Sequence, residues 1–431
     1  MSGALKDPVK IAVLGCGTVG TQVVRLLTEQ ADDLAWRVGA PVVLAGVYVR
    51  DTAVPRDVVV PVPSLTSDAE ALIADADVVV EVMGGIEPAR TMILQAIAAG
   101  ASVVTANKAL LAAHGPELYE AADAAGVDLY FEAAVAGAIP IVRPVRESLA
   151  GDHVTRVLGI VNGTTNYVLD EMTTKGLAYG DVVSEAQRLG YAEADPTADV
   201  EGYDAAAKAA ILASLAFHQR VSLDVVHREG ISTVTADDVA AAADSGHVIK
   251  LLAIAERVDG GVAVRVHPAL VPLTHPLAGV HGAFNAVFVE AEAAGSLMFY
   301  GQGAGGAPTA SAVLGDVVSV ARHIAQGGRG PLESNYADLP VLPIDQVSSR
   351  FQLRMFVVDE PGMLAEIAGT LGRRGISIET VRQKPAAHDA HAEVVIATHR
   401  ALESDMASVL EDFKALDAVL DISSVLRIEG E

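Results

Sequence analysis

The stretch KIAVLGCGTVGTQVVRLLTEQ, residues 10–30, joins an apolar run, a glycine-rich turn and a segment with helical periodicity. The apolar run suits a buried strand, and the glycines of GCGTVG allow a tight turn and close approach of the backbone to a pyrophosphate. The helix that follows would present its N-terminus to the phosphates. An ordinary glycine-rich turn is the alternative, but its place at the first strand-to-helix turn of an alternating domain favours a dinucleotide site. The cofactor residues expected in this loop are Gly15, Gly17, Thr18, Val19 and Gly20.

Apolar runs alternate with helical segments from the N-terminus to about residue 150. Further runs occupy residues 42–50, 76–85, 101–108 and 127–135, and each is separated from the next by the length of a helix. Strands that are apolar on both faces and joined by helices form parallel, doubly wound sheets. We therefore expect an α/β fold with a Rossmann-type dinucleotide-binding domain over residues 1–150.

The middle of the chain, residues 151–327, has a different pattern of polar and apolar residues. Turn-rich stretches at 161–172 and 189–202 precede alternating segments such as VAVRVHPALVP (262–272) and NAVFVEAEAAG (285–295). This pattern indicates a mixed α+β domain, to which we assign substrate binding and dimerisation. The helix expected at 308–326 should return to the first domain.

The C-terminal region follows a linker at 328–348, which has the glycine and proline content of irregular chain. Residues 349–431 then read strand, helix, strand, strand, helix, strand, which is the order of a ferredoxin-like βαββαβ unit. Two apolar helix faces are expected here, and they consist of Leu364, Ile367 and Leu371, and of Leu402, Met406, Val409 and Phe413. We expect no catalytic residues in this region.

The composition excludes several classes of function. With 55 acidic against 30 basic residues and a formal net charge of −25, we expect no nucleic-acid partner and no membrane partner. Every long apolar stretch is broken before it reaches the length of a membrane span, and the N-terminus lacks a secretory cleavage pattern. Cys16 is the only cysteine, so neither an intrachain disulfide nor a thiolate metal cluster can form. The expected location is the cytoplasm.

The helical stretch GYDAAAKAAILASLAF, residues 202–217, carries one lysine in its apolar stripe. Lys208 lies one turn after Asp204, so the two side chains can form an ion pair on one face of the helix. A lysine that extends its ammonium group to the surface is the alternative. Burial lowers the pKa of a lysine, so Lys208 could release and regain a proton near neutral pH. The charge of Asp204 opposes this lowering of the pKa and orients the ammonium group of Lys208.

Two expected strand ends carry polar residues typical of ligand sites. Arg50 ends the second strand, where an acidic residue usually holds the ribose hydroxyls of NAD, and an arginine suits the 2′-phosphate of NADP. Asp51 follows it, and a solvated arginine is an equal alternative. Thr105, Asn107 and Lys108 follow another apolar run, at the edge where open α/β sheets bind ligands.

Six motifs, in order along residues 10–325, resemble the homoserine dehydrogenase family: GCGTVG, TANK, FEAAVAGAIP, NGTTNY, GYAEADPTADVEGYDAAAK and YGQGAGGAPTASAV. The resemblance implies interconversion of L-homoserine and L-aspartate 4-semialdehyde, in threonine, methionine and isoleucine biosynthesis, with NADP as the expected cofactor and NAD as the alternative. Another amino-acid dehydrogenase, or a nucleotide and amino-acid sensor without catalysis, remains as an alternative. An acyl-phosphate-forming aldehyde dehydrogenase is excluded, because it needs a cysteine nucleophile and Cys16 lies in the phosphate loop.

The resemblance also implies roles for individual residues. Lys208 matches the family's catalytic lysine, which exchanges a proton with the substrate oxygen, and Asp204 is assigned to catalysis with it. Glu193 and Asp204 would bind the amino group of homoserine, with Asp199 in support. Lys108 is placed for the substrate carboxylate or the cofactor.

Weaker assignments complete the substrate and cofactor sites. Thr164 and Tyr191 are further substrate candidates, although Thr164 could equally cap a helix. Gly190 and Gly303 are assigned to the cofactor by the same resemblance.

The motif FEAAVAGAIP, residues 131–140, resembles the family's monovalent-cation loop. The residues that would present oxygens, mainly carbonyls, to a sodium ion are Glu132, Val135, Gly137 and Ile139. A hinge between domains is the alternative. No catalytic transition metal is expected, and the histidines of HDAH (388–391) are interpreted as a solvated polar turn.

The segment VVDEPGMLAEIAGTLGRRGISIETV, residues 357–381, resembles an ACT domain, a module that binds free amino acids between paired copies. The resemblance implies a homo-oligomer with a regulatory domain over residues 349–431. Threonine is the expected effector, and retention of the domain only for dimerisation is the alternative.

Overall fold

The computed structural model describes residues 7–55, 60–385 and 391–430, so most of the HDAH motif lies outside the described residues. The chain divides into two compact units. Residues 1–163, 204–226 and 283–338 form the first unit, and residues 164–203, 227–282 and 339–431 form the second. Neither unit is continuous in the sequence, and their limits differ from the expected domain boundaries, because segments distant in the chain pack into one core.

The first unit contains the N-terminal elements together with α9 and the segment from β11 to α11. Its strands are β1 (Val9–Leu14), β2 (Val42–Tyr48), β3 (Leu65–Thr66), β4 (Val78–Glu81), β5 (Ser102–Thr105), β6 (Leu129–Tyr130), β7 (Val154–Ile160), β11 (Phe284–Ala291) and β12 (Gly295–Gln302). Its helices are α1 (Thr18–Glu29), α2 (Ala31–Val38), α3 (Ala69–Ala74), α4 (Ala89–Ala98), α5 (Lys108–Ala125), α9 (Tyr203–Phe217) and α11 (Gly306–Gln326), with a short π-helix at Pro144–Ser148.

The second unit contains the remaining elements. Its strands are β8 (His227–Arg228), β9 (His247–Val258), β10 (Gly261–Pro272), β13 (Ser348–Val358), β14 (Ile378–Pro385), β15 (His391–Thr398), β16 (Ala401–Leu402) and β17 (Val419–Ile428). Its helices are α6 (Gly163–Lys175), α7 (Tyr179–Leu189), α8 (Thr197–Val200), α10 (Ala236–Asp244), α12 (Met363–Arg373) and α13 (Glu403–Lys414).

A parallel six-stranded sheet in the order β3-β2-β1-β4-β5-β6 confirms the Rossmann-type prediction. The central strands consist mainly of valine, isoleucine and leucine residues that are buried on both faces, which is why each strand appears as a continuous apolar run in the sequence. The additional strand β3 has only two residues, too few to give a sequence pattern. The strand order reverses between β1 and β4, the point at which such sheets bind nucleotides.

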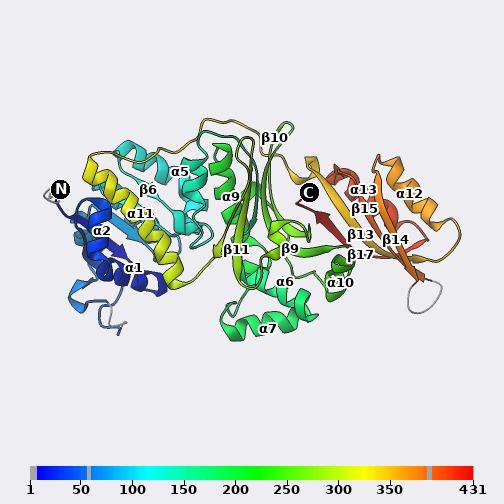
Figure 1. Ribbon diagram of the computed structural model, residues 1–431, viewed down its shortest axis with the longest axis horizontal. Helices are drawn as coiled ribbons and strands as arrows, with labels where there is room; N and C mark the ends of the chain where they lie inside the picture. The colour runs from blue at the N-terminus through cyan, green and yellow to red at the C-terminus, as the bar shows by residue number, and fades with distance from the viewer. Residues whose placement is uncertain (1–6, 56–59, 386–390, 431) are drawn as a thin grey trace. The chain divides into compact units, whose positions relative to one another are not determined.

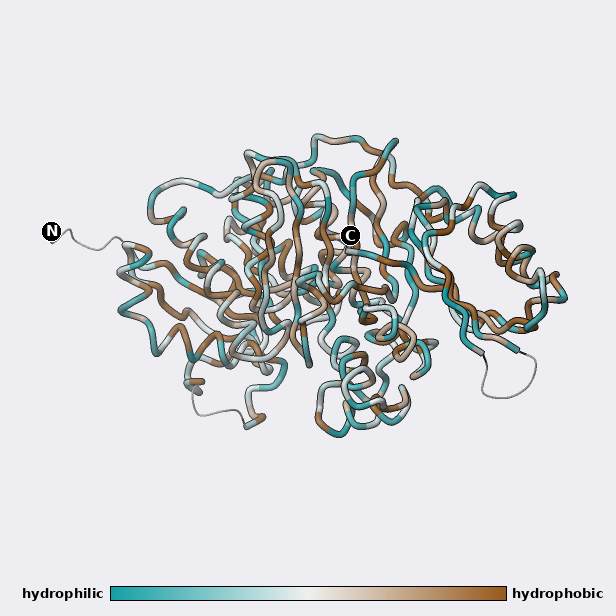
Figure 2. The backbone as a smooth tube through the Cα atoms, turned by 45° about the vertical axis from the view of Figure 1, so that its right-hand side comes forward, coloured by the Kyte–Doolittle hydropathy of each residue, from teal (hydrophilic) through white to brown (hydrophobic). Residues whose placement is uncertain are grey.

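Helices cover both faces of this sheet. On one face α1, α2 and α11 pack against one another, and α3, α4 and α5 form the layer on the other face. Figure 1 shows the yellow α11 beside the blue α1. Buried alanine and valine side chains of α11 therefore join the core of the N-terminal sheet. Figure 2 shows hydrophobic colour concentrated along the strands.

The rest of the first unit consists of the antiparallel strands β7, β11 and β12 and the helix α9. Nearly all of α9 is buried, and its alanines allow close packing on every side. A helix that is apolar all round belongs in a protein interior. Any charged group on α9 must therefore find its partners inside the protein.

The second unit contains the C-terminal βαββαβ fold that the sequence predicted. Strands β17, β13, β15 and β14 form an antiparallel sheet, α12 and α13 share its hydrophobic core, and β17 also pairs in parallel with β10. Two side chains of the expected apolar faces are instead partly exposed, Leu364 at 38% and Leu402 at 40%. Leu402 is the N-cap residue of α13 and lies before its buried face, whereas Leu364 lies in the first turn of α12.

The stretch at 161–172, expected to be turn-rich, forms most of helix α6. The side chains of Asn166 and Asp170 bond to distant backbone instead of to their own turn. Asn166 Nδ2 donates to the carbonyls of Val280 (3.2 Å) and Gly282 (2.8 Å), and Asp170 accepts the Gly282 N–H at 2.7 Å. These tertiary bonds remove the local competition that makes such residues poor helix formers.

Residues 328–338, within the expected linker, contain no helix or strand but are anchored in the first unit. The Gly330 N–H donates to Asp128 at 2.8 Å, and Arg220 donates to both carboxylate oxygens of Glu333 at 3.0 and 2.8 Å. Within the described part of the chain, no helix combines the length and apolar character required to cross a membrane.

Candidate active site

The carboxyl ends of β4 and β5 carry a buried polar network. Glu81, the last residue of β4, is fully buried and accepts a 2.7 Å hydrogen bond from the Thr105 hydroxyl. Its other oxygen accepts the N–H groups of Met83 (2.8 Å) and Gly84 (3.2 Å). The Thr105 hydroxyl in turn accepts the Asn107 N–H at 3.0 Å. The network fixes the backbone that follows both strands at the nucleotide-binding edge.

Asn107 caps helix α5. Its Oδ1 accepts the Leu110 N–H at 3.1 Å, and its Nδ2 donates to the Gly85 carbonyl at 2.6 Å. Lys108 is the first residue of α5, and its Nζ forms an ion pair with Asp204. The predicted residues Thr105, Asn107 and Lys108 are therefore brought together, and they connect the sheet edge to α9.

Asp204, in the first turn of α9, is the centre of the candidate active site. Its Oδ2 accepts from Lys208 Nζ at 2.7 Å and from Asn162 Nδ2 at 2.9 Å, while Oδ1 faces Lys108. Lys208 Nζ also donates to the Val161 carbonyl at 2.6 Å, just beyond the end of β7. Asp204 is only 9% exposed and Lys208 only 7%, so this lysine does not extend to the surface.

The electrostatics of this cluster favour a permanent carboxylate. Burial raises the pKa of Asp204, but the charges of Lys208 and Lys108 outweigh burial and hold the pKa well below its usual range. The N-terminus of α9 adds a favourable dipole. Asp204 is therefore ionised at neutral pH and orients both ammonium groups.

The GCGTVG loop has the backbone geometry of a phosphate-binding turn. Gly15 has φ 105°, and a Cβ on Gly20 would lie 2.1 Å from the Gly15 carbonyl oxygen. Gly17 is the N-cap of α1, and the space where its side chain would lie is open. Thr18 and Val19 begin α1. The loop thus fits a pyrophosphate at the N-terminus of α1.

Arg50 lies past the end of β2, whose last residue is Tyr48, and its side chain is exposed. The strand is two residues shorter than expected, so Arg50 belongs to the following turn. Asp51 in the same turn accepts the Ala53 N–H at 2.8 Å. A role for Arg50 at a 2′-phosphate stays a prediction.

Further predicted residues lie in the second unit, and they are Thr164, Gly190, Tyr191, Glu193 and Asp199. The Thr164 hydroxyl donates to the Tyr191 carbonyl at 2.7 Å, which ties the start of α6 to the turn after α7. Gly190 ends α7 with φ 79°, and the Glu193 carbonyl accepts from Gln187 at 3.1 Å. Asp199 lies in α8. Their roles toward substrate or cofactor stay predictions.

The predicted sodium loop surrounds the buried Glu132. Its carboxylate accepts the N–H groups of Ile141 (2.6 Å), Val142 (2.7 Å) and Arg143 (3.0 Å). These bonds occupy the carboxylate, so a cation would depend mainly on the carbonyls of the predicted set, Glu132, Val135, Gly137 and Ile139. Ala136 has φ 55°, an uncommon conformation for a residue other than glycine, so the surrounding structure must hold this loop.

Two neighbours of this loop were not assigned to it from the sequence. Asp316 of α11 accepts the Glu132 N–H at 2.7 Å, and burial, together with the charge of Glu132, raises the pKa of Asp316 to about 7. Gly303, predicted to contact the cofactor, packs against this loop. A Cβ on Gly303 would lie 2.0 Å from the Asn285 side chain, and a Cβ on Gly137 would lie 2.4 Å from the Gly303 carbonyl oxygen. A cofactor role for Gly303 stays a prediction.

No group of three or more histidine, cysteine, aspartate or glutamate side chains suited to a metal ion occurs in the ranges that the structure describes. A site built from main-chain carbonyls would not belong to such a group.

Sequence reasoning missed two residues of the central cluster. Glu81 is the only charged side chain of an otherwise all-valine strand, and that isolation was its signal. Asn162 belongs to the NGTTNY motif and follows a buried strand directly, but its bond to Asp204 depends on the packing of β7 against α9.

The Rossmann-type sheet with its glycine loop, the buried lysine and the C-terminal βαββαβ unit define a dinucleotide-binding oxidoreductase with an appended ACT domain. Family models agree along the chain: "homoserine dehydrogenase, NAD binding domain" matches residues 15–132, "homoserine dehydrogenase" matches 140–318 and "ACT domain" matches 351–418. A homoserine dehydrogenase of Corynebacterium glutamicum is 57% identical over 430 residues, covering 98% of this chain and 96% of that one. The chain belongs to the homoserine dehydrogenase family.

Solved structures support the same assignment. The crystal structure of a homoserine dehydrogenase from Thiobacillus denitrificans has a TM-score of 0.90 at 40% identity, and 98% of each chain is covered. A hyperthermophilic archaeal homoserine dehydrogenase in complex with NADPH has a TM-score of 0.61 at 26% identity, covering 73% of this chain and 97% of that one.

The strand-end network predicts a strong effect of replacing Glu81. Glu81→Leu removes the acceptor for the Thr105 hydroxyl and two N–H groups, and each unsatisfied buried group costs about 1–3 kcal/mol. We expect a lower Tm and weaker dinucleotide binding, measured by thermal unfolding and calorimetric titration. Glu81→Gln keeps one acceptor oxygen, so its Tm and its dinucleotide Kd should lie between those of the unchanged protein and of Glu81→Leu. Glu411→Leu, at a surface pair, is the control, and an unchanged dinucleotide Kd in Glu81→Leu would contradict the role of the network.

Proposed function

We propose that this protein is an NADP-preferring homoserine dehydrogenase that interconverts L-homoserine and L-aspartate 4-semialdehyde by hydride transfer. The observation that carries the proposal is the cluster of buried Lys208 and Asp204 with the half-exposed Lys108, beside a dinucleotide-binding sheet edge. Family membership and the NADPH bound by the archaeal relative support the substrate and the cofactor. In the biosynthetic direction the enzyme would serve threonine, methionine and isoleucine synthesis in the cytoplasm.

In the proposed mechanism a side chain of this protein transfers the proton, and the cofactor transfers the hydride. The nicotinamide, when bound, supplies or accepts the hydride at the carbon that carries the oxygen. Lys208 Nζ donates a proton to the aldehyde oxygen during reduction and accepts it from the alcohol during oxidation. Asp204 fixes the direction of that ammonium group through their 2.7 Å bond. Lys108 is 46% exposed and balances Asp204 from the other side, so it also suits the substrate carboxylate.

The remaining substrate assignments follow the same proposal. Glu193 and Asp204 bind the substrate ammonium group, Asp199 supports them, and Thr164 and Tyr191 shape the site. The carboxylate of Asp204 stays ionised because of its two lysines, which suits contact with a cation.

A sodium ion in the loop at residues 131–140 is part of the proposal. The loop fits a monovalent ion better than a divalent one, because its carboxylate is already bonded and carbonyls remain as ligands. The ion would hold the chain between β6 and the π-helix, and no catalytic step depends on it.

A homo-oligomer is also proposed. Strand β12 lies at the end of the antiparallel set β7, β11 and β12, and alternate side chains along it are exposed. Among them, Tyr300 stacks on Phe284 with 5.2 Å between ring centroids. An exposed strand edge with aromatic side chains suits pairing with a second copy.

Replacing Lys208 tests the catalytic assignment. Lys208→Ala should lower kcat by about 10²–10⁴-fold because proton transfer is lost, whereas NADP binding should remain. Lys208→Arg keeps a positive charge beside Asp204 but cannot release a proton, so it should be nearly as inactive. Lys175→Ala, at an exposed ion pair, is the control. Near-normal turnover of folded Lys208→Arg would exclude acid–base catalysis by this residue.

Arg50 determines the cofactor preference in this proposal. Arg50→Ala should raise KM for NADP by about tenfold or more and leave KM for NAD nearly unchanged, because only NADP has the 2′-phosphate. Initial rates with both cofactors measure the difference. Arg37→Ala, at an exposed pair on α2, is the matched control. Equal changes in KM for NADP and for NAD would show that Arg50 is only a solvated turn residue.

Threonine should inhibit the full-length enzyme through the ACT domain. Gly362 has φ 98° at the N-terminus of α12, beside an open hollow lined by residues 359–364 and Gln383. Exposed N–H groups at a helix N-terminus suit a carboxylate, and the effect on Lys208 would be allosteric. Gln383→Ala should weaken inhibition several-fold while basal activity remains. Absence of inhibition of the full-length enzyme at 10 mM threonine would overturn this part of the proposal.

A point variant is a sharper test than removal of the ACT domain. Arg265 is 1% exposed and bonds to Glu429 at 2.9 Å, next to the strand pair β10–β17. Deleting β17 and Glu429 would remove one of the two carboxylates that pair with the buried Arg265 and leave only Glu256. Removal of one partner of a buried charge destabilises proteins strongly.

A further inference from the structure

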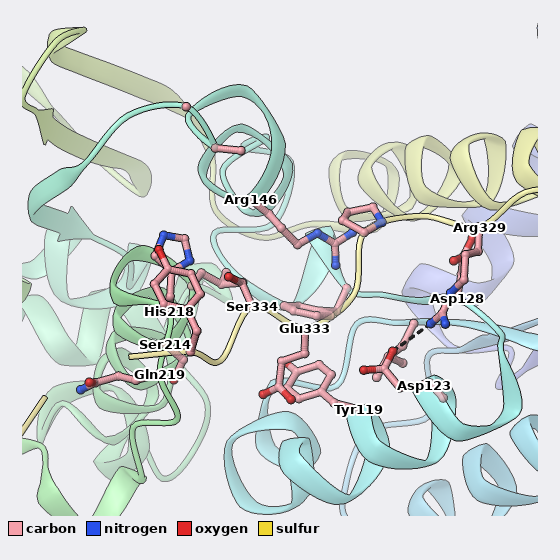
Figure 3. A pocket seen from close by; sticks show the side chains of 18 of the residues that line it. Tyr119, Asp123, Asp128, Arg146, Ser214, His218, Gln219, Arg329, Glu333 and Ser334 are labelled. Atoms are coloured by element: carbon pink, nitrogen blue, oxygen red, sulfur yellow. Dashed lines mark hydrogen bonds and ion pairs between the residues drawn. The ribbon is translucent and has the colours of Figure 1, made fainter. Parts of the chain in front are cut away.

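A cavity of about 330 Å³ lies in the first unit, at the ends of α5 and α9 that are opposite to the active site. Its walls come from the C-terminal part of α5, the segment after the π-helix, the end of α9 and residues 329–336 (Figure 3). All of these segments belong to one compact unit. Lys108 and Lys208 lie toward the other ends of the same two helices, and Lys108 is about 16 Å along α5 from Tyr119.

Most charged groups around this cavity already have partners. Asp123 pairs with Arg329 at 2.8 Å, Asp128 bonds to His323 at 2.6 Å, and Glu333 is held by Arg220. Carboxylates and an arginine that are already paired have few donors or acceptors left for a ligand. Ligand recognition must therefore come from a different group.

Arg146 supplies that group. Its side chain is only 10% exposed, and the guanidinium stacks on the Tyr130 ring at 4.4 Å from the ring centroid. Arg146 Nη2 forms a long ion pair of 3.6 Å with the half-exposed Glu147, and neither Nε nor Nη2 makes a hydrogen bond within the described chain. Figure 3 shows Arg146 reaching toward the cavity between the helices and residues 329–336. A buried guanidinium with unused donors favours a carboxylate, which accepts two of its hydrogen bonds.

The other walls select the rest of the ligand. Tyr119 and Phe131 pack with 5.9 Å between ring centroids, and Leu215 extends this apolar surface. The C-terminal ends of α5 and α9 carry partial negative charge, which favours an ammonium group over a further negative charge. A carboxylate, an ammonium group and a bulky apolar body occur together in a large apolar amino acid.

We propose that this cavity is a further small-molecule site that binds a free amino acid with a bulky apolar side chain, with its carboxylate on Arg146. The site is separate from the Lys208 cluster and from the hollow at Gly362, because it shares no lining residue with either. The aromatic pair of Tyr119 and Phe131 contacts the side chain of the amino acid.

The test uses the full-length protein and defined probes. L-Phenylalanine and L-leucine are titrated by calorimetry, with phenethylamine as the control without a carboxylate and L-alanine as the control without the apolar body. Hydrogen–deuterium exchange then locates the site. We expect binding of at least one probe, with slowed exchange in residues 119–131, 146–153 and 214–219, and no comparable binding of either control.

Two variants separate this site from any other amino-acid site. Arg146→Gln should weaken binding by about tenfold or more, because a charged hydrogen bond contributes about 1.5–3 kcal/mol. Gly151 lines the cavity and a Cβ there meets nothing within 4 Å, so Gly151→Phe is expected to narrow the cavity and weaken binding. Gly180→Phe, at an equally open position on α7, is the matched control. Absence of binding by both probes, or binding unaffected by Arg146→Gln and Gly151→Phe, would overturn the proposal.

Discussion

The carboxylate of Asp204 is the constraint on which the rest of the candidate site depends. A carboxylate that is 9% exposed is stable only if positive charges and hydrogen-bond donors surround it. Lys208, Lys108 and Asn162 supply them from α9, α5 and the end of β7. These three elements must therefore converge, and removal of any one partner would leave a buried charge only partly compensated. The same convergence fixes the ammonium group of Lys208 within the apolar helix α9.

At the nucleotide edge of the sheet a second buried carboxylate is likewise surrounded by hydrogen-bond donors. Glu81 holds Thr105 and the backbone after β4, and Thr105 positions Asn107, which caps the helix that begins with Lys108. One chain of hydrogen bonds thus joins the end of β4 to the lysine that faces Asp204. The glycine loop after β1 lies at the same edge, because parallel strands present their carboxyl ends together. The glycine loop and the lysine cluster consequently share one scaffold.

Helices α5 and α9 are shared by two chemically different sites. Near their N-terminal ends they carry the lysines of the candidate active site, and at their C-terminal ends they line the cavity of Arg146. The anchored segment at 329–336 closes that cavity. A ligand there would contact the same two helices that carry Lys108 and Lys208.

The sequence by itself determined the parallel sheet, the glycine loop, the βαββαβ unit and the pairing of Asp204 with Lys208, because strand runs, helix spacing and motif order are local properties. It also placed Asn107 and Lys108 at a strand end. Only the tertiary structure showed that Lys108 and Asn162 meet Asp204, that Glu132 is bonded to the backbone of Ile141 and Val142, and that residues 163–175 form a helix. These features depend on contacts between residues far apart in the chain, and no local pattern encodes such contacts.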